Sequence, residues 1–269
     1  MKTIGFVGAG NMARALGGGI GKQAGADSFS LVATDPIPAA VESFADETGG
    51  RGAADIPTLL AASDVVVLAV KPQVLAAVMA DMKPHMAPRH LVISIVAGAT
   101  LGGMAEGVGT DARIVRAMPN TPALVRQGMT VLVGGPHATS DDLRLAEGLF
   151  AAVGRAVIVD EEALLDAVTA VSGSGPGFLF AYAESMLQAA GAVGLPPDLA
   201  VQLVQQTILG SAVLWQESAE GVDVLRQRVT SPGGTTQAGL EALAARDFAA
   251  AVRAAIEAAT ARSRELSAG

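Results

Sequence analysis

Short apolar runs alternate with helix-like stretches over the first half of the chain. Runs rich in Val, Ile and Leu predict strands at residues 3–7, 29–33, 64–70, 91–96, 113–117, 130–133 and 156–159. Apolar residues at helical spacing predict helices at residues 11–23, 38–48, 74–82 and 141–153. The run DVVVLAV at 64–70 is apolar throughout, as is typical of a strand covered on both faces. The alternation predicts an α/β fold with a parallel, doubly wound sheet.

The pattern changes near residue 160. Beyond it the sequence predicts helices only, at residues 161–171, 176–193, 197–217, 222–229, 235–245 and 248–267. We therefore expect a dinucleotide-binding domain at 1–160 and an all-α domain at 161–269. The stretch 199–216 is apolar around most of its circumference, so it is expected to be buried against other protein. A homodimer formed through the helical domain would bury it more easily than a single bundle.

Composition narrows the classes of function. The chain has 18 basic and 26 acidic residues, a net charge of −8, which argues against nucleic acid or an anionic membrane as partner. It has no cysteine, which excludes disulfides, thiolate nucleophiles and cysteine-ligated metals, and its three histidines argue against a histidine-rich metal site. We expect no metal. The N-terminus enters a strand at once without a leader pattern, and the uncharged stretch 199–216 contains several Gln residues, so we expect a cytoplasmic chain without a membrane span.

A glycine-rich segment, Gly8-Ala9-Gly10-Asn11-Met12-Ala13, follows the first predicted strand and opens the first predicted helix. It matches the dinucleotide fingerprint G-x-G-x-x-G/A, in which the first glycine permits a tight turn and the second lets the pyrophosphate approach. The third position, here alanine, allows close helix–strand packing. Free N–H groups at the helix start would bind the phosphates. The alternative is a tight turn without a ligand.

An acidic residue at the end of the second strand bears on the choice of dinucleotide. Asp35 lies 22 residues beyond Ala13, near the spacing at which an acid binds the adenosine ribose hydroxyls of NAD. It would repel the 2′-phosphate of NADPH, so NAD(P)H is expected with NADH slightly favoured. The alternative is that Asp35 caps the next helix, beside Pro36 and Pro38.

Other predicted strands also end in candidate cofactor residues, because ligands bind at the carboxyl ends of such strands. Ala69-Val70-Lys71-Pro72 follows one strand, and Lys71 is either a cofactor contact or a solvated lysine. Ala97-Gly98 follows the next and leaves room for a nicotinamide ring. Asn120 and Thr121 offer neutral hydrogen bonds from a rigid loop between two prolines, whose alternative is a plain turn.

Two loops in the helical half suggest a second anion site. Ser231-Pro232-Gly233-Gly234-Thr235-Thr236 precedes a predicted helix, and its hydroxyl and N–H groups could hold a substrate carboxylate. The alternative is an ordinary helix cap with a glycine turn. Ser172–Gly177 resembles it, although close helix packing would also require its glycines. All four lysines precede residue 84, so the helical half has no lysine to protonate a carbonyl. An already protonated C=N group needs no such acid.

The chain resembles the pyrroline-5-carboxylate reductase family over essentially its whole length. The resemblance is carried by GFVGAGNMA at 5–13, AVKP at 69–72, RAMPNTP at 116–122, VSGSGP at 171–176 and SPGGTT at 231–236. It implies a Rossmann domain followed by a helical domain that dimerises and often forms decamers. It also implies reduction of 1-pyrroline-5-carboxylate to L-proline with NAD(P)H.

The resemblance implies roles for particular residues. The cofactor would be lined by Val7, Gly8, Ala9, Gly10, Asn11, Met12, Asp35, Ala69, Val70, Lys71, Pro72, Ile95, Val96 and Ala97. Thr235 and Thr236 would bind substrate, with the Thr236 hydroxyl near the ring nitrogen as the catalytic group. Ser231, Gly233 and Gly234 would shape the carboxylate cradle. Glu162 matches a substrate-site acid, or else is a solvated acid favoured by the dipole of its helix.

The sequence departs from the family pattern before the SPGGTT motif. Arg226-Gln227-Arg228 replaces the usual Lys-Asp-Asn or Lys-Asp-Met, and Gly221-Val222 replaces a His-Pro pair. Two alternatives to proline formation remain open at this point. One is a related reductase of another cyclic imine or a 3-hydroxy acid, and the other is a non-catalytic dinucleotide sensor.

Overall fold

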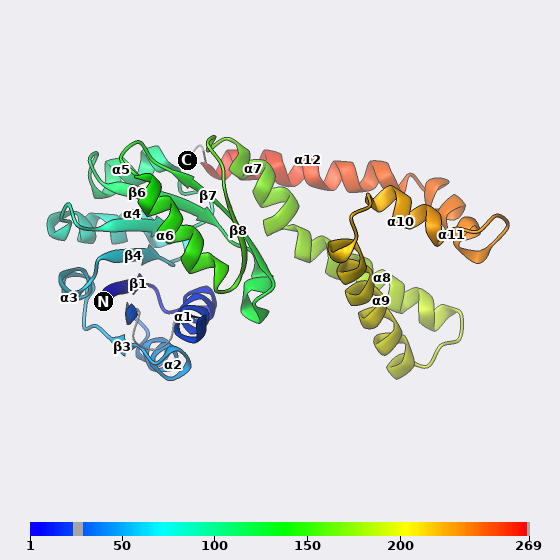
Figure 1. The fold of residues 1–269 in the computed structure, drawn as a ribbon, viewed down its shortest axis with the longest axis horizontal. Coiled ribbons are helices and arrows are strands. Elements are labelled where there is room, and N and C mark those ends of the chain that lie inside the picture. The colour runs from blue at the N-terminus through cyan, green and yellow to red at the C-terminus, as the bar shows by residue number, and fades with distance from the viewer. Residues whose placement is uncertain (24–28, 268–269) are drawn as a thin grey trace. The chain divides into compact units, whose positions relative to one another are not determined.

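The computed structural model describes residues 1–23 and 29–267. The chain divides into two compact units (Figure 1). The first comprises Met1–Ser174 together with the residues from Ala259 onward, and the second comprises Gly175–Ala258. The packing boundary therefore lies beyond residue 160, where the strand pattern ends, because the first helical turns after the last strand pack on the α/β unit.

An eight-stranded sheet forms the centre of the first unit. Its strands are β1 (Lys2–Val7), β2 (Phe29–Thr34), β3 (Arg51–Gly52), β4 (Val65–Leu68), β5 (Leu91–Ser94), β6 (Arg113–Met118), β7 (Gly128–Gly134) and β8 (Gly154–Ile158). They lie in the order β3-β2-β1-β4-β5-β6-β7-β8. The order reverses between β1 and β4, and ligands of open α/β sheets bind at the carboxyl ends of the strands beside such a reversal.

Helices cover both faces of this sheet. They are α1 (Asn11–Gln23), α2 (Pro38–Thr48), α3 (Ile56–Ala62), α4 (Pro72–Met82), α5 (Leu101–Val108) and α6 (Ser140–Ala151). In β4, Val65 and Val67 pack into one buried cluster with residues of α1, α2 and α6. Val66 and Leu68 pack into the other cluster, with residues of α3, α4 and α5. Alternate side chains thus serve opposite faces, which explains why the strand is apolar throughout.

The predicted strands and helices of the first half are confirmed, and α1 and α2 have the predicted bounds. The hydrophobic pattern did not predict α3, α5 or the two-residue β3. Helix α5 contains Gly102, Gly103 and Gly107, and each glycine costs about 1 kcal/mol of helix propensity relative to alanine. Helix α5 instead depends on packing, because Met104 and Val108 are buried against the sheet.

One strand departs from the all-parallel expectation: β7 runs antiparallel to β6. Only residues 119–127 separate the two strands. A parallel neighbour needs a crossover of a dozen or more residues, whereas an antiparallel neighbour can follow a short connection. This connection contains a 3₁₀ turn over Thr121–Val125, and it fixes the direction of β7.

After β8 the described chain contains only helices. They are α7 (Leu164–Val168), a π-helical turn (Thr169–Gly173), α8 (Gly175–Ala192), α9 (Pro197–Glu217), α10 (Val222–Arg228), α11 (Thr235–Ala244) and α12 (Phe248–Ser267). This confirms the predicted helices. The reading of Ser172–Gly177 as a loop is wrong, since these residues are almost all helical. A Cβ on Gly173 would lie 2.7 Å from the Met118 side chain, so this glycine serves close packing.

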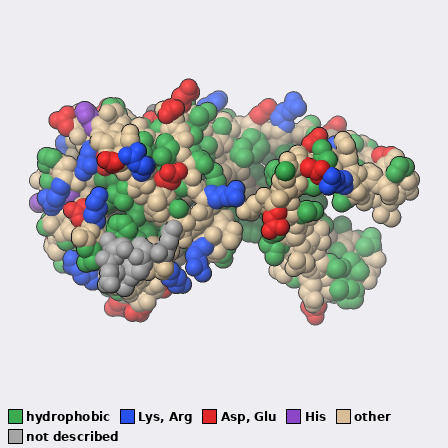
Figure 2. All heavy atoms as spheres, viewed as in Figure 1, with side chains coloured by type: hydrophobic (Ala, Val, Ile, Leu, Met, Phe, Trp, Pro, Cys, Tyr) green, Lys and Arg blue, Asp and Glu red, His purple; other side chains and the backbone are tan. Residues whose placement is uncertain are grey.

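The second unit exposes many apolar side chains (Figure 2). In α9 only Ala200 and Val204 are buried, while Leu209, Leu214 and Trp215 are exposed. The run Leu164–Ala192 has the length and hydropathy of a membrane span, and 11% of its most apolar window is buried. A helix covered by other protein has the same composition. A single chain therefore leaves most of α9 uncovered, and burial of this helix against another protein chain stays a prediction.

Candidate functional site

Gly8 joins the ends of three strands at the reversal of the sheet. Its φ of 99° is in the left-handed region, and its N–H donates to the Thr34 carbonyl at 2.9 Å. A Cβ at this position would lie 2.5 Å from the Ala69 carbonyl oxygen. The backbones of the β1–α1 turn and of the segment after β4 thus approach so closely that only glycine fits.

Gly10 stands immediately before α1 and has open space around it. Its carbonyl accepts the Arg14 N–H at 3.0 Å, the first bond of the helix. A Cβ on Gly10 would meet no atom within 4 Å. The first N–H groups of a helix have no intrahelical acceptor, and they attract anions. The open space and these donors fit a dinucleotide pyrophosphate.

Asp35 connects β2 to the glycine-rich turn. Its Oδ2 accepts the Ala9 N–H and its Oδ1 accepts the Ile37 N–H, both at 2.9 Å. An ionised carboxylate has about four acceptor positions, so capacity remains for a ribose hydroxyl. The bond to Ile37 resembles the capping alternative, while the bond to Ala9 fixes the turn that a dinucleotide would contact.

A cleft of about 620 Å³ adjoins this turn and is bordered by Val7, Gly8, Asp35 and Val70. Three of its lining residues are acidic, namely Asp35, Asp55 and Asp81, and His85 is its basic lining residue. Asp55 was not among the predicted site residues; it caps α3 by accepting the Thr58 N–H at 2.8 Å. This hydrogen bonding to Thr58 lowers the pKa of Asp55. An aspartate before Ile56-Pro57 was an available helix-start signal.

The segments after β4 and β5 continue the same sheet edge. Ala69 donates to the Val7 carbonyl at 2.8 Å, and Ile95 donates to the Leu68 carbonyl at 3.1 Å. The structure therefore brings Val7, Ala69 and Ile95 together, as a shared cofactor edge requires. Lys71 is exposed at the N-cap of α4, and Pro72 is its first residue. Val96 is buried, whereas Ala97 is exposed.

Asn120 is engaged with the protein itself. Its Oδ1 accepts the Met129 N–H at 2.8 Å. Its Nδ2 lies 3.2 Å from both the carbonyl and the hydroxyl oxygen of Ser172. The side chain thus ties the loop after β6 to β7 and to the π-helical turn. This gives Asn120 a clear structural task beside the predicted cofactor contact.

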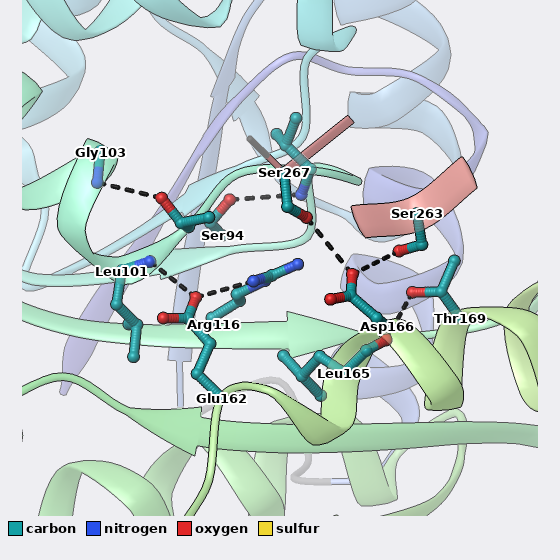
Figure 3. A network of polar contacts seen from close by, with 12 residues as sticks. Ser94, Leu101, Gly103, Arg116, Glu162, Leu165, Asp166, Thr169, Ser263 and Ser267 are labelled. Atoms are coloured by element: carbon teal, nitrogen blue, oxygen red, sulfur yellow. Dashed lines mark hydrogen bonds and ion pairs between the residues drawn. The ribbon is translucent and has the colours of Figure 1, made fainter. Parts of the chain in front are cut away.

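Glu162 is also committed within the first unit (Figure 3). Its Oε1 accepts the Leu101 N–H at 2.8 Å and pairs with the Arg116 guanidinium at 2.7 Å. The Arg116 side chain is 6% exposed and that of Glu162 29%. Glu162 therefore neutralises a buried arginine and supplies a carboxylate at the start of α5, where the helix dipole favours it. These contacts differ from the solvated alternative, and direct contact with substrate stays a prediction.

A second carboxylate in Figure 3, that of Asp166, contacts the last turns of α12. Asp166 accepts the hydroxyl of buried Ser263 at 2.7 Å and lies 3.4 Å from that of Ser267. The last turns of α12 also lie beside the segment after β5. A Cβ on Gly98 would lie 3.0 Å from the Leu266 carbonyl oxygen. The C-terminal helix thus borders the loop that includes Ala97.

The second unit carries the loop before α11. Gly233 has a φ of 69°, and the Gly234 N–H donates to the Ser231 carbonyl at 3.0 Å. A Cβ on Gly234 would lie 2.3 Å from the Ser231 hydroxyl oxygen, so an alanine here would displace that hydroxyl. Thr235 and Thr236 are the first two residues of α11, and both are exposed. Their N–H groups have no acceptor within the helix, because they belong to its first turn. The loop therefore presents hydroxyl and N–H donors to solvent.

One residue that departs from the family pattern, Arg228, forms an ion pair shortly before this loop. Arg228, the last residue of α10, pairs with Glu220 in the α9–α10 connection. The other oxygen of Glu220, Oε2, is buried without a hydrogen-bond partner within the described chain. Sequence reasoning missed Glu220, because its partner Arg228 lies eight positions further along the chain and in a different element. As for metals, no group of three or more His, Asp or Glu side chains is arranged to hold an ion among residues 1–23 and 29–267.

Two family models match the chain. Residues 162–266 match pyrroline-5-carboxylate reductase dimerisation, and residues 3–98 match NADP oxidoreductase, coenzyme F420-dependent. The first match covers the helices with exposed apolar faces. The second covers the glycine-rich turn and the segments after β4 and β5.

Full-length relatives give the same result. The chain is 40% identical over 263 residues to a pyrroline-5-carboxylate reductase of Pseudomonas aeruginosa, covering 98% of this chain and 96% of the relative. The structure of a Coxiella burnetii pyrroline-5-carboxylate reductase matches with a TM-score of 0.92 at 36% identity, over 99% and 98% of the two chains. A Plasmodium falciparum pyrroline carboxylate reductase with NADP bound matches with a TM-score of 0.87 at 32% identity, over 99% and 98%.

Proposed function

The chain belongs to the pyrroline-5-carboxylate reductase family, and we propose that it reduces 1-pyrroline-5-carboxylate to L-proline with a nicotinamide dinucleotide as hydride donor. One observation carries the proposal beyond family membership. The chain has a dinucleotide-type turn at Gly8–Ala13 and a separate helix start with free donors at Thr235 and Thr236. Since the first suits a pyrophosphate, the second is available for a substrate carboxylate.

The chemistry suits the residues of the second loop. A protonated cyclic imine accepts a hydride at its C=N carbon, and its nitrogen becomes the amine of proline without a further proton at that step. The protein then has to orient the ring, hold the carboxylate and donate a hydrogen bond. We assign the carboxylate to the loop Ser231–Gly234 with Thr235, and the hydrogen bond near the ring nitrogen to the Thr236 hydroxyl. The absence of lysine from the helical half agrees with this chemistry.

We further propose that the enzyme prefers NADH to NADPH. The cleft beside the glycine-rich turn is lined by Asp35, Asp55 and Asp81, and no Lys or Arg is among its described lining residues. A 2′-phosphate carries about −1.5 to −2 charges at neutral pH, which these carboxylates would repel. Arg14 is already engaged, with Asn11 at 2.7 Å and Glu47 at 3.3 Å. The remaining capacity of Asp35 suits ribose hydroxyls.

Oxidation of NADH and of NADPH with 1-pyrroline-5-carboxylate, followed by identification of proline, tests both proposals. We expect proline with both cofactors and a higher kcat/KM for NADH. Asp35→Asn removes one negative charge and keeps one acceptor oxygen, so it should shift the ratio toward NADPH by a factor of about 5–30, or about 1–2 kcal/mol. Asp46→Ser removes an exposed carboxylate of α2 and serves as the matched control.

Two outcomes would contradict these proposals. Dinucleotide binding without imine reduction would favour the sensor alternative or another imine substrate. A ratio of kcat/KM values that is equal for the wild type and Asp35→Asn would refute the role of Asp35 in cofactor choice.

The dimerisation region supports an oligomer. We propose that two copies meet through the exposed apolar faces of α8 and α9, as a homodimer that could assemble further into a decamer, and that these faces contact protein rather than a membrane. We also propose that the enzyme acts in the cytoplasm without a nucleic-acid partner. Light scattering after size-exclusion chromatography measures the mass. A monomer at micromolar concentration would refute the dimer.

A further inference from the structure

The loop before α11 is held by a side chain from inside the helix. Gly233, whose φ is 69°, donates its N–H to Oε1 of Gln237 at 2.8 Å. Gln237 is the third residue of α11, since the helix begins at Thr235. A Gln or Glu at this position commonly reaches back to a backbone N–H preceding the helix. Here it binds the loop one residue before the N-cap, Gly234.

A second hydrogen bond fixes the orientation of the Gln237 amide. Its Nε2 donates to Oε1 of Glu241 at 2.8 Å, one helical turn later. A carboxylate accepts but does not donate, so Glu241 requires the NH₂ group on its side and leaves the carbonyl oxygen facing Gly233. The chain Glu241–Gln237–Gly233 thus fixes one backbone N–H of the loop while those of Thr235 and Thr236 remain for a ligand.

For binding an anion at this helix start, the lack of charge on Gln237 is as important as its carbonyl acceptor. Glutamate could accept the same Gly233 N–H, but it would add a negative charge at the helix start. That charge would oppose an anionic ligand of the same helix end. Glutamine supplies the acceptor without the repulsion.

We propose that Gln237 is a positioning residue, which shapes the Ser231–Gly234 loop for the substrate carboxylate while keeping that end of α11 free of negative charge. This inference rests on the proposed function of the loop. It predicts effects on imine binding that are separate from dinucleotide binding and from hydride transfer.

The test compares Gln237→Ala and Gln237→Glu with the wild type in the full-length enzyme. Loss of the hydrogen bond in Gln237→Ala should raise KM for 1-pyrroline-5-carboxylate about fivefold, the ratio that corresponds to one ordinary hydrogen bond, with kcat and dinucleotide Kd retained. Gln237→Glu should also raise KM, and the effect should shrink between about 0.05 and 0.5 M salt because charge repulsion is screened. Gln127→Glu adds the same charge at an exposed position of the first unit and should leave KM unchanged.

Amide hydrogen exchange of residues 229–237 provides a readout that does not depend on catalysis. Gln237→Ala should exchange faster at Gly233, whereas Gln237→Glu should retain protection. If Gly233 loses protection while KM is unchanged, the positioning role is overturned although the enzyme still reduces the imine. If the wild type does not reduce the imine, the proposed function fails, and hydrogen exchange still tests the loop geometry. Equal KM values for Gln237→Glu and the wild type at low salt would overturn the charge argument.

Discussion

Two glycines of the β1–α1 turn should respond differently to an added methyl group. In Gly8→Ala the alanine would have to adopt a φ near 99°, which costs about 1–2 kcal/mol. Its Cβ would also lie 2.5 Å from the Ala69 carbonyl oxygen, a backbone atom that cannot rotate away. Overpacking of this kind costs about 1–3 kcal/mol. We therefore expect the free energy of unfolding to fall by about 2–5 kcal/mol.

Gly10→Ala is the matched comparison two residues later. No atom lies within 4 Å of the new Cβ, and the φ of Gly10 is outside the left-handed region. The free energy of unfolding should stay within about 0.5 kcal/mol of the wild type. The methyl group would nevertheless occupy the space assigned to the pyrophosphate. Dinucleotide affinity should therefore fall about tenfold or more, or at least about 1.4 kcal/mol.

Urea unfolding at one fixed protein concentration measures stability, because an oligomer makes the midpoint concentration-dependent. Quenching of NADH fluorescence or calorimetry measures the dinucleotide Kd. Equal destabilisation of the two variants would refute the contrast between a crowded Gly8 and an open Gly10. An unchanged Kd in Gly10→Ala would refute the assignment of this space to the pyrophosphate.

Two further predictions concern His90 and Thr236. Burial lowers the pKa of His90, whose Nδ1 accepts the Ala87 N–H and whose Nε2 donates to the Leu60 carbonyl at 3.0 Å. As the pH falls, His90 of the unfolded chain is protonated before His90 of the folded chain, so the free energy of unfolding should fall below about pH 6.5. Urea midpoints measured from pH 8 to 5 should fall less steeply in His90→Gln than in the wild type. Equal slopes of midpoint against pH would contradict the assignment. Thr236→Ala should lower kcat for imine reduction, by a loss of transition-state stabilisation smaller than the ~2.7–4 kcal/mol typical of an oxyanion-hole donor, while dinucleotide Kd is retained. An unchanged kcat/KM would rule out a catalytic role.

The sequence predicted most elements of the fold because their signals are local. The alternation of strands and helices, the apolar run in β4 and the glycine-rich turn require no knowledge of distant residues. Helix α5 escaped prediction because its glycines weaken the local signal, and burial of Met104 and Val108 compensates for them. The antiparallel β7 escaped because strand direction depends on how a short connection can cross the sheet.

The candidate site was predictable as a set of loops but not as a set of contacts. Position alone indicated that Asp35 follows the second strand, yet its bond to Ala9 joins residues 26 positions apart. From its position, Glu162 could be a solvated acid at the start of a helix, but it pairs with the buried Arg116, 46 positions away. Neither partner can be inferred from residue spacing, since both are brought together by the order of strands in the sheet.

The amino-acid sequence alone therefore determined the change from alternating strands and helices to helices only, the glycine-rich turn and the resemblance to the reductase family, since each resides in a continuous stretch of chain. Tertiary structure decided which polar groups are already committed, as with Asn120 and Glu162, and which remain available, as with the first N–H groups of α11. The physical reason is that a hydrogen-bonding group is used up only by a partner within about 3 Å, and folding alone sets that proximity.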